Sequence, residues 1–243
     1  MTNQTTDISR RKAAKVAGLG LIIMLIPAVF ANYFVFSSLV VPEDAASTAS
    51  NITASEGLFR AGIVSWLIVL ILDVVVAWAL YVFLKPVNKS ISLLAAWFRL
   101  IYTAIGGITL LSLVFVLVLL SGAEYLTVFE TSQLHALVMQ FFNGYDYGFA
   151  IGMFFFFLHL GILGYLVYKS GSIPRILGVL LIVASFSYLT IGIGKLLIPN
   201  YPEIITTVAS APGAIGEIAF ALWLLIKGSK TLEVKNQDKT SEE

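Results

Sequence analysis

The chain has 243 residues, of which 58% are hydrophobic and 12% are charged, and its formal net charge is +1. Soluble domains carry about 25% charged residues, so this chain lacks the polar surface that a soluble protein needs. The small net charge gives no field that would favour nucleic acid, and the lack of cysteine excludes disulfides, thiolate catalysis and cysteine-ligated metals.

Six stretches of the chain are long and apolar enough to cross a bilayer. A hydrocarbon core about 30 Å thick needs about 20 apolar residues in a helix, which also satisfies every backbone hydrogen bond internally. The sequence therefore predicts an all-α, polytopic integral membrane protein with a six-helix transmembrane bundle. The expected helices cover about residues 16–41, 58–84, 93–122, 144–168, 175–197 and 204–227.

Polar segments flank this single transmembrane domain, which covers residues 16–227. Residues 1–15 are expected to form a cytoplasmic N-terminal segment, and the polar residues 228–243 a disordered cytoplasmic tail. The first apolar stretch follows basic residues, as in a signal peptide, but it is longer than the apolar region of one and lacks a small-residue cleavage site. We therefore expect this stretch to remain as the first helix.

The basic residues indicate the orientation of the bundle. All of them except Arg60 and Lys195 fall at the termini or beside the connections after the second and fourth helices, which six crossings place on one side. Acidic residues gather in the other connections. Because Lys and Arg are enriched in cytoplasmic loops, both termini are predicted to be cytoplasmic.

The connections on the opposite side are longer and contain helical segments. Pro42, Glu43 and Asp44 place proline and acids where a helix N-terminus favours them, which predicts an alanine- and serine-rich helix running toward Arg60. Residues 131–143 carry apolar side chains at helical spacing. This segment either lies on the membrane surface or extends the fourth helix outward.

Several short motifs in these connections and helix ends resemble one family. They are Arg11-Lys12-Ala13-Ala14, Asp44-Ala45-Ala46, Ser55-Glu56-Gly57-Leu58-Phe59-Arg60, Leu84-Lys85-Pro86-Val87-Asn88-Lys89, Lys169-Ser170-Gly171, Pro174-Arg175-Ile176-Leu177-Gly178, Pro199-Asn200-Tyr201, Gly216-Glu217 and Leu222-Trp223-Leu224. Over roughly residues 10 to 230 the chain resembles the bacterial membrane proteins of the domain-of-unknown-function (DUF) family 4386. The resemblance implies a six-helix integral membrane protein, and it brings no reaction, ligand or functional residue.

Three ionisable residues, Asp73, His159 and Glu217, lie about ten to thirteen residues inside their predicted helices. At 1.5 Å rise per residue all three fall near the bilayer midplane, where a charge costs several kcal/mol unless it is paired or hydrated. The sequence therefore predicts a candidate polar midplane site from these residues, if their helices pack together. The alternative for each is a structural hydrogen bond between helices.

Two local patterns bear on this site. Gly148, Gly152 and His159 share one helix face, and glycines on that face let another helix approach closely. His159 is therefore expected to face protein rather than lipid. Pro212 and Gly213 precede Glu217 and predict a kinked or broken helix, which would free backbone carbonyls near the acid.

Three further charged residues, Arg60, Asp146 and Lys195, lie near the outer ends of their helices and form a candidate outer polar layer. Lys195 either pairs with Asp146 or extends to water. Arg99 lies at the inner edge of its apolar stretch, in a polar stripe on that helix, and is expected to act as an interfacial anchor to lipid phosphate.

The sequence leaves three functions open. The first is a small proton-linked transporter or permease, for which two associated copies are expected because six helices are few. The second is a non-catalytic membrane sensor or assembly partner, and the third is an intramembrane lipid-modifying enzyme with His159 as general base. Enzyme activity is the least favoured of the three. No metal, cofactor or nucleic acid is expected, and the partners are the lipid bilayer of the prokaryotic cytoplasmic membrane, a homo-oligomer and an unidentified ligand.

Overall fold

The computed structural model describes residues 2–198 and 201–228. Across these residues the chain forms helices and connecting turns with no strand, as the all-α prediction requires. The predicted tail at 228–243 lies, except for Gly228, outside the described residues. Six helices in the described part are long and apolar enough to span a membrane, which confirms the polytopic bundle.

The first span is composite. It comprises α1 (Thr2–Val29), a π-helical segment η1 (Phe30–Phe36) and the short α2 (Ser37–Leu39). The other spans are single helices. They are α4 (Glu56–Leu84), α5 (Lys89–Leu119), α6 (Thr131–Lys169), α7 (Arg175–Leu197) and α8 (Glu203–Ile226).

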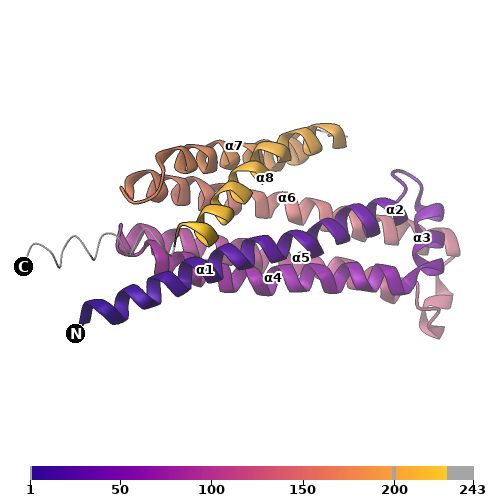
Figure 1. Cartoon of the computed structure of the whole chain (residues 1–243). Helices are drawn as coiled ribbons and strands as arrows, with labels where there is room; N and C mark the ends of the chain where they lie inside the picture. The colour runs from indigo at the N-terminus through magenta and orange to yellow at the C-terminus, as the bar shows by residue number, and fades with distance from the viewer. Residues whose placement is uncertain (1, 199–200, 229–243) are drawn as a thin grey trace, which may run out of the picture.

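Short turns join α4 to α5 and α6 to α7 at one end of the bundle, where the N-terminus also lies (Figure 1). We call this the basic end, because its turns carry Lys85, Lys89, Lys169 and Arg175. Asn88 fixes the start of α5, since its side-chain oxygen accepts a hydrogen bond from the Ile91 amide at 3.0 Å.

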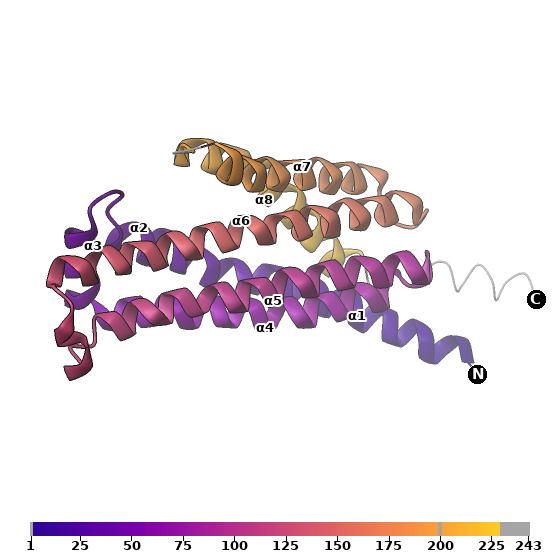
Figure 2. The same cartoon turned by 180° about the vertical axis from the view of Figure 1, so that it is seen from behind.

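The opposite end holds two short helices, α3 (Ala45–Ala54) and the 3-10 segment η2 (Glu124–Val128), seen together in Figure 2. As the sequence predicted, Asp44 caps the alanine- and serine-rich α3 by accepting the Ser47 amide hydrogen bond at 2.9 Å. Residues 131–143 extend the fourth span, because α6 runs from Thr131 without a break.

The spanning helices form a closed ring. Contacts join α1 to α4, α4 to α5, α5 to α6, α6 to α7, α7 to α8, and α8 back to α1. Figure 1 shows how α8 makes this closure: it begins beside α7 and crosses toward α1 at the basic end. The first and last spans are therefore neighbours, and the interior of the ring is shared by all of them.

Glycines permit the closest crossings in this ring. A Cβ atom on Gly164 of α6 would lie 2.7 Å from the Gly178 carbonyl oxygen of α7, and one on Gly18 of α1 would lie 2.9 Å from the Ala221 carbonyl oxygen of α8. Side chains larger than hydrogen do not fit at these distances. Small residues at helix crossings are typical of membrane bundles, because packing rather than water drives the association of helices in lipid.

The surface of the bundle is apolar, while polar groups lie inside. Large side chains such as Ile26, Trp78, Ile108 and Leu111 are more than half exposed. Asp73, Arg99 and His159 are at most 2% exposed. This distribution is the reverse of a soluble domain and suits a bundle surrounded by lipid.

Candidate functional site

The centre of the site is a cluster of three buried residues from consecutive spans, which we call the buried triad: Asp73 of α4, Arg99 of α5 and His159 of α6. The Arg99 Nη2 atom forms an ion pair with Asp73 Oδ1, and Arg99 Nη1 lies 3.1 Å from His159 Nε2. The structure therefore brings two of the three predicted midplane residues together, through an arginine between them.

The hydrogen bonds define the tautomer of His159. Its Nδ1 atom lies 2.8 Å from the Ala95 carbonyl oxygen, which can only accept, so Nδ1 carries the proton. Arg99 can only donate, so Nε2 accepts. Both ring nitrogens are occupied in this neutral form, and neither is free to act as a general base in this conformation.

Arg99 fills its site with further contacts. Its guanidinium carbon lies 5.5 Å from the centre of the Phe156 ring, within the range of a cation–π interaction. Nη2 also lies 3.8 Å from the Met24 sulfur of α1. Only Nε of this side chain has no partner among the described residues. Arg99 thus connects α1, α4, α5 and α6.

The expectation that Arg99 anchors to lipid phosphate is wrong, because the side chain is 1% exposed and paired inside the bundle. The reason lies in where α5 begins. The apolar stretch starts at Leu100, but the helix starts at Lys89, ten residues before Arg99. At 1.5 Å per residue, this places Arg99 about 15 Å into the helix.

Depth explains why the triad meets. Asp73 lies eleven residues before the end of α4 at Leu84, and His159 lies ten residues before the end of α6 at Lys169. Those helix ends and the start of α5 all lie at the basic end, so the three side chains reach the same level. Glu217, nine residues before the end of α8 at Ile226, lies at a similar depth.

Glu217 is partly buried and has a different partner. Its Oε1 atom accepts a hydrogen bond of 2.7 Å from the Tyr188 hydroxyl of α7. It makes no direct contact with Asp73 or His159 in the described hydrogen bonds, although the charges of Arg99 and Asp73 are close enough to act on it. The predicted three-residue site is therefore divided into the triad and a neighbouring Tyr188–Glu217 pair.

One aromatic ring joins these two parts. Phe156 faces the Arg99 guanidinium on one side, and its ring centre lies 5.0 Å from that of Tyr188 in an edge-to-face arrangement. A change in the position of Tyr188 would therefore also shift the Phe156 ring that contacts Arg99.

Of the kink or break expected at Pro212 and Gly213, the break does not occur, since α8 is continuous from Glu203 to Ile226. Pro212 lies inside this helix, where it has no amide hydrogen to donate to the preceding turn. The irregular backbone lies instead in the first span, in the π-helical η1. There the Ser37 amide hydrogen-bonds the Asn32 carbonyl five residues earlier. π-Helical segments occur frequently at functional sites.

A cavity of about 470 Å³ opens at the end opposite the basic end, between η1, α6, α7 and α8. We call it the outer cavity. Six aromatic side chains line its wall: Tyr33, Phe36, Phe142, Tyr145, Phe149 and Tyr188. The apolar Val40, Pro42, Met153 and Ile191 also line it, together with polar and charged side chains that include Asn32, Ser37, Thr206, Thr207 and Ser210. Tyr188 therefore lines the cavity and also holds Glu217.

The predicted outer polar layer is only partly assembled. Lys195 Nζ lies 3.1 Å from Asp146 Oδ2, and both residues line the outer cavity. Arg60 instead pairs with Glu56 of its own helix, and both side chains are more than half exposed. Lys195 thus pairs with Asp146, the first of the two alternatives, while Arg60 does not join them.

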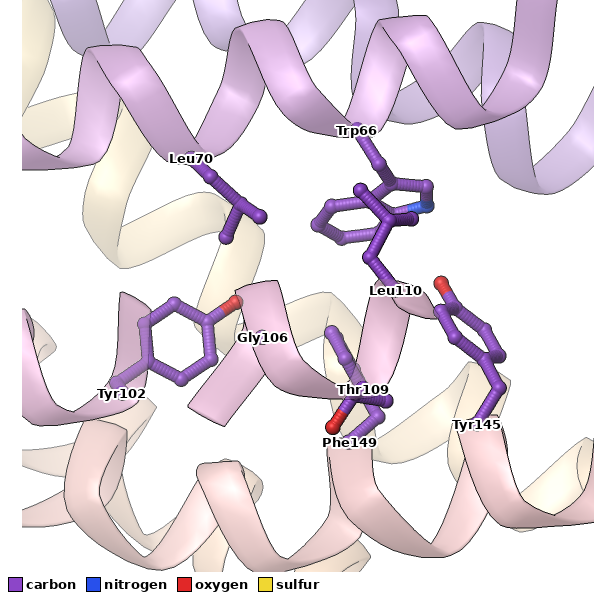
Figure 3. Close-up of a pocket in the computed structure, with 8 residues that line it drawn as sticks. All are labelled: Trp66, Leu70, Tyr102, Gly106, Thr109, Leu110, Tyr145 and Phe149. Carbon is purple, nitrogen blue, oxygen red and sulfur yellow. The ribbon is translucent and has the colours of Figure 1, made fainter. Parts of the chain in front are cut away.

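A second, much smaller space of about 10 Å³ lies between the outer cavity and the triad. Figure 3 shows Trp66 and Leu70 reaching from α4 toward Tyr102 of α5 and Tyr145 of α6. The space holds no more than about one water molecule. Tyr145 also lines the outer cavity, whereas the Tyr102 ring packs on Phe156 at 4.7 Å, beside Arg99.

Sequence reasoning missed Arg99 as a member of the site and missed Tyr188 as the partner of Glu217. The polar stripe on the helix of Arg99 was visible, but a stripe does not identify partners on other helices. Among the described residues, no group of three His, Asp or Glu side chains could hold a metal ion.

Comparison with known proteins agrees with the resemblance seen in the motifs. The sequence pattern of the family described as "Domain of unknown function (DUF4386)" matches residues 16–228. An uncharacterized protein of the archaeon Archaeoglobus fulgidus is 38% identical over 173 residues, which cover 71% of this chain and 86% of the relative. Similar proteins are therefore not confined to bacteria. No solved structure matches the chain. The chain belongs to the DUF4386 family, whose function is unknown, and is a multi-pass helical membrane protein.

Proposed function

We propose that this chain is a small proton-linked transporter of the prokaryotic cytoplasmic membrane, with both termini cytoplasmic and the outer cavity open to the opposite side. One observation carries the proposal: a 470 Å³ cavity has in its wall a tyrosine, Tyr188, that hydrogen-bonds a carboxyl group, Glu217, at the depth of the triad. Ligand cavities in proteins typically have volumes of about 300–1,000 Å³.

The orientation follows from charge. The basic end carries the lysines and arginines of the short turns, which favour the cytoplasmic side. On this assignment the outer cavity faces the exterior. The Asp146–Lys195 pair lies at its polar wall, and Tyr188 and Glu217 lie deeper.

In the inner half of the bundle, the space beside His159 and Ala96 is too small for a water molecule. Ser92, Ala95 and Ala96 of α5 line it together with larger side chains, which include Leu80, Tyr81, Leu84 and Leu163. An outward-open, inward-closed bundle is one of the two states that alternating access requires.

In this proposal Glu217 carries the proton. The charged or titratable groups around it include Tyr188 of α7, Arg99 and Tyr102 of α5 and Asp73 of α4. Protonation would weaken the charge-assisted bond from Tyr188 and change the position of that ring against Phe156. The triad would then serve as the fixed support against which α7 and α8 move.

Cysteine accessibility tests the proposal directly, because the natural chain has no cysteine. Ser210→Cys places a thiol in the outer cavity, and Ala96→Cys places one at the closed inner space. A membrane-impermeant maleimide is applied to either face of oriented vesicles. Transport predicts that Ser210→Cys reacts from outside, that Ala96→Cys reacts slowly from inside, and that Glu217→Gln changes the ratio of these rates.

The control is Ile108→Cys, whose side chain is 69% exposed on the apolar surface and which should react from neither face. Reaction at this control would show that the reagent reaches positions on the lipid-facing surface. If Ala96→Cys stays unreactive from inside with and without Glu217→Gln, alternating access is contradicted.

The second candidate is a non-transporting membrane sensor or assembly partner, and it is favoured by the nearly complete pairing within the triad. In this candidate function, the buried triad only holds α4, α5 and α6 together. It predicts that triad substitutions reduce thermal stability while thiol reaction rates at Ser210→Cys and Ala96→Cys do not respond to Glu217→Gln. The proposed association of two copies is tested by the mass of the purified protein in detergent.

A further inference from the structure

We propose that the outer cavity binds organic monocations with an apolar body, such as lipophilic phosphonium or quaternary ammonium ions. The assignment of these cations as the substrate class rests on the proposed transport function. Their binding to the cavity can be measured independently of transport. The argument depends on the shape, the aromatic wall and the charge balance of the cavity.

The cavity suits an apolar body with a delocalised charge. Its volume of about 470 Å³ is that of a small-molecule site, and six aromatic side chains line its wall. Phenylalanine and tyrosine faces attract cations through their ring quadrupoles, by about 2 kcal/mol or more where water is excluded. An anion would be repelled by these faces, because they are the negative part of the ring quadrupole.

The charge balance of the interior leaves one acid without an ion-pair partner. Asp73 is paired with Arg99, and Asp146 is paired with Lys195. Glu217 has no ion pair in the described part of the chain, and its bond comes from the neutral Tyr188. When Glu217 is ionised, the five groups together carry one negative charge. A monocation in the cavity would neutralise it.

Lys195 does not reverse this preference. Its ammonium group lies 3.1 Å from Asp146, so the pair presents a dipole with no net charge to the cavity. Removing the acid would expose the lysine charge. Asp146→Asn is therefore expected to weaken cation binding and to favour anions.

The same balance explains how cation and proton would compete. A proton on Glu217 removes the charge that attracts the cation, and a cation near Tyr188 opposes that proton. The proton binds the Glu217 carboxyl group, and the cation acts on the same group from beside Tyr188. Binding of one ligand therefore opposes binding of the other, as exchange of the two across a membrane requires.

The experiment uses two probes of nearly equal shape and opposite charge, tetraphenylphosphonium and tetraphenylborate. Each is equilibrated by dialysis with the full chain in nanodiscs, and binding to empty nanodiscs is subtracted. We expect saturable binding of the phosphonium and none of the borate. Glu217→Gln should weaken phosphonium binding by about tenfold or more, because it removes the uncompensated charge.

Glu56→Gln is the matched control, since Glu56 is an exposed acid paired with Arg60 and is not in the cavity wall. This variant should bind the phosphonium like the natural chain. The inference is overturned if the borate binds as well as the phosphonium, if neither probe saturates, or if Glu56→Gln and Glu217→Gln lower affinity equally. Asp146→Asn provides an independent arm, because a variant with unchanged charge preference would contradict the charge balance.

Binding and transport fail separately. If the thiol reaction rates respond to Glu217→Gln but the chain does not bind the phosphonium, the transport proposal stands and the cation-binding proposal fails. If the chain binds the phosphonium saturably but the Ala96→Cys thiol never reacts from inside, the cation-binding proposal stands and the transport proposal fails.

Discussion

Arg99 of α5 and Asp73 of α4 form an ion pair inside the bundle, although 26 residues separate them in the chain. A single tight turn joins their two helices. Arg99 lies ten residues after its helix begins, and Asp73 lies eleven residues before its helix ends. The turn between the helices thus places the two charges at one level. His159 of α6 then accepts a hydrogen bond from Arg99 at 3.1 Å, so one arginine joins three spans.

Loss of Arg99 should be strongly destabilising. Arg99→Met removes the donor from Asp73 and leaves a buried carboxylate without its partner, which typically costs about 3–5 kcal/mol. The measurement is the free energy of unfolding in mixed micelles. The double variant Asp73→Leu with Arg99→Met removes both charges and should recover much of the loss. Equal destabilisation by the single and double variants would contradict the pairing.

His159 should carry its proton on Nδ1 at neutral pH, because that atom donates to the Ala95 carbonyl at 2.8 Å. Nitrogen NMR of labelled histidine measures the tautomer, and His135→Gln leaves a single histidine to observe. Arg99→Met removes the donor to Nε2 and should change the Nε2 shift. A doubly protonated ring in the natural chain would contradict the hydrogen-bond assignment.

The helices were predictable from the sequence, and part of the site was as well. Hydropathy and length give the spans, because lipid admits few alternatives to a helix. Asp73 and His159 could be expected to meet, since both lie at similar depth from the basic end. The depth of Arg99 was predicted wrongly because it was measured from the start of the apolar stretch rather than from the start of the helix. Asn88, a capping residue after the Pro86 turn, was the signal for the true start.

The partner of Glu217 could not be predicted, because hydropathy does not determine which helices are neighbours. Arg60 pairs with Glu56, four residues earlier in its own helix, and that spacing was visible in the sequence. The ring order depends on close approaches such as Gly164 to Gly178, which require the shapes of both helices. Tyr188 meets Glu217 only because α7 and α8 are adjacent. The π-helical segment of the first span likewise has no clear signature in composition.

A methyl group at Gly164 should disrupt the α6–α7 crossing. Gly164→Ala would place Cβ 2.7 Å from the Gly178 carbonyl oxygen and 3.0 Å from the Ile182 amide nitrogen. Both atoms are backbone, so the helices must separate, at a cost of about 1–3 kcal/mol. Gly107→Ala is the control, because its Cβ meets no atom within 4 Å. It should be neutral or stabilising by up to about 1 kcal/mol in thermal unfolding, since alanine favours helix.

Tyr188→Phe should affect the cavity more than the fold. The change keeps the ring against Phe156 but removes the hydrogen bond of 2.7 Å to Glu217, at a cost of about 1–2 kcal/mol of stability. The rate at which Ser210→Cys is labelled from outside should change, as is also expected for Glu217→Gln. Tyr165→Phe, on an exposed tyrosine of α6, is the control and should change neither quantity. A Tyr188→Phe variant with natural labelling would show that the pair does not influence the cavity.

The cap of α3 should be sensitive to acid. Hydrogen bonds from the Ser47 amide and hydroxyl lower the pKa of Asp44 below its ordinary value of 3.8. Because the folded pKa is the lower one, the stabilisation is complete above pH 3.8 and is lost as pH falls through the folded value. Amide exchange protection in α3, corrected for intrinsic rates, measures this loss. Asp44→Asn still caps but does not titrate, so its protection should not respond to acid in this way.

The tight α4–α5 turn also bears on how the chain enters lipid during synthesis. A lone charge at the centre of an inserting helix costs about 2.5–3.5 kcal/mol. Asp73 and Arg99 belong to consecutive spans, so a hairpin inserted as one unit delivers both charges already neutralised by each other. The earliest pair of helices able to cross the bilayer without an exposed ion is therefore α4 with α5, and the later spans assemble onto a hairpin that is electrically balanced.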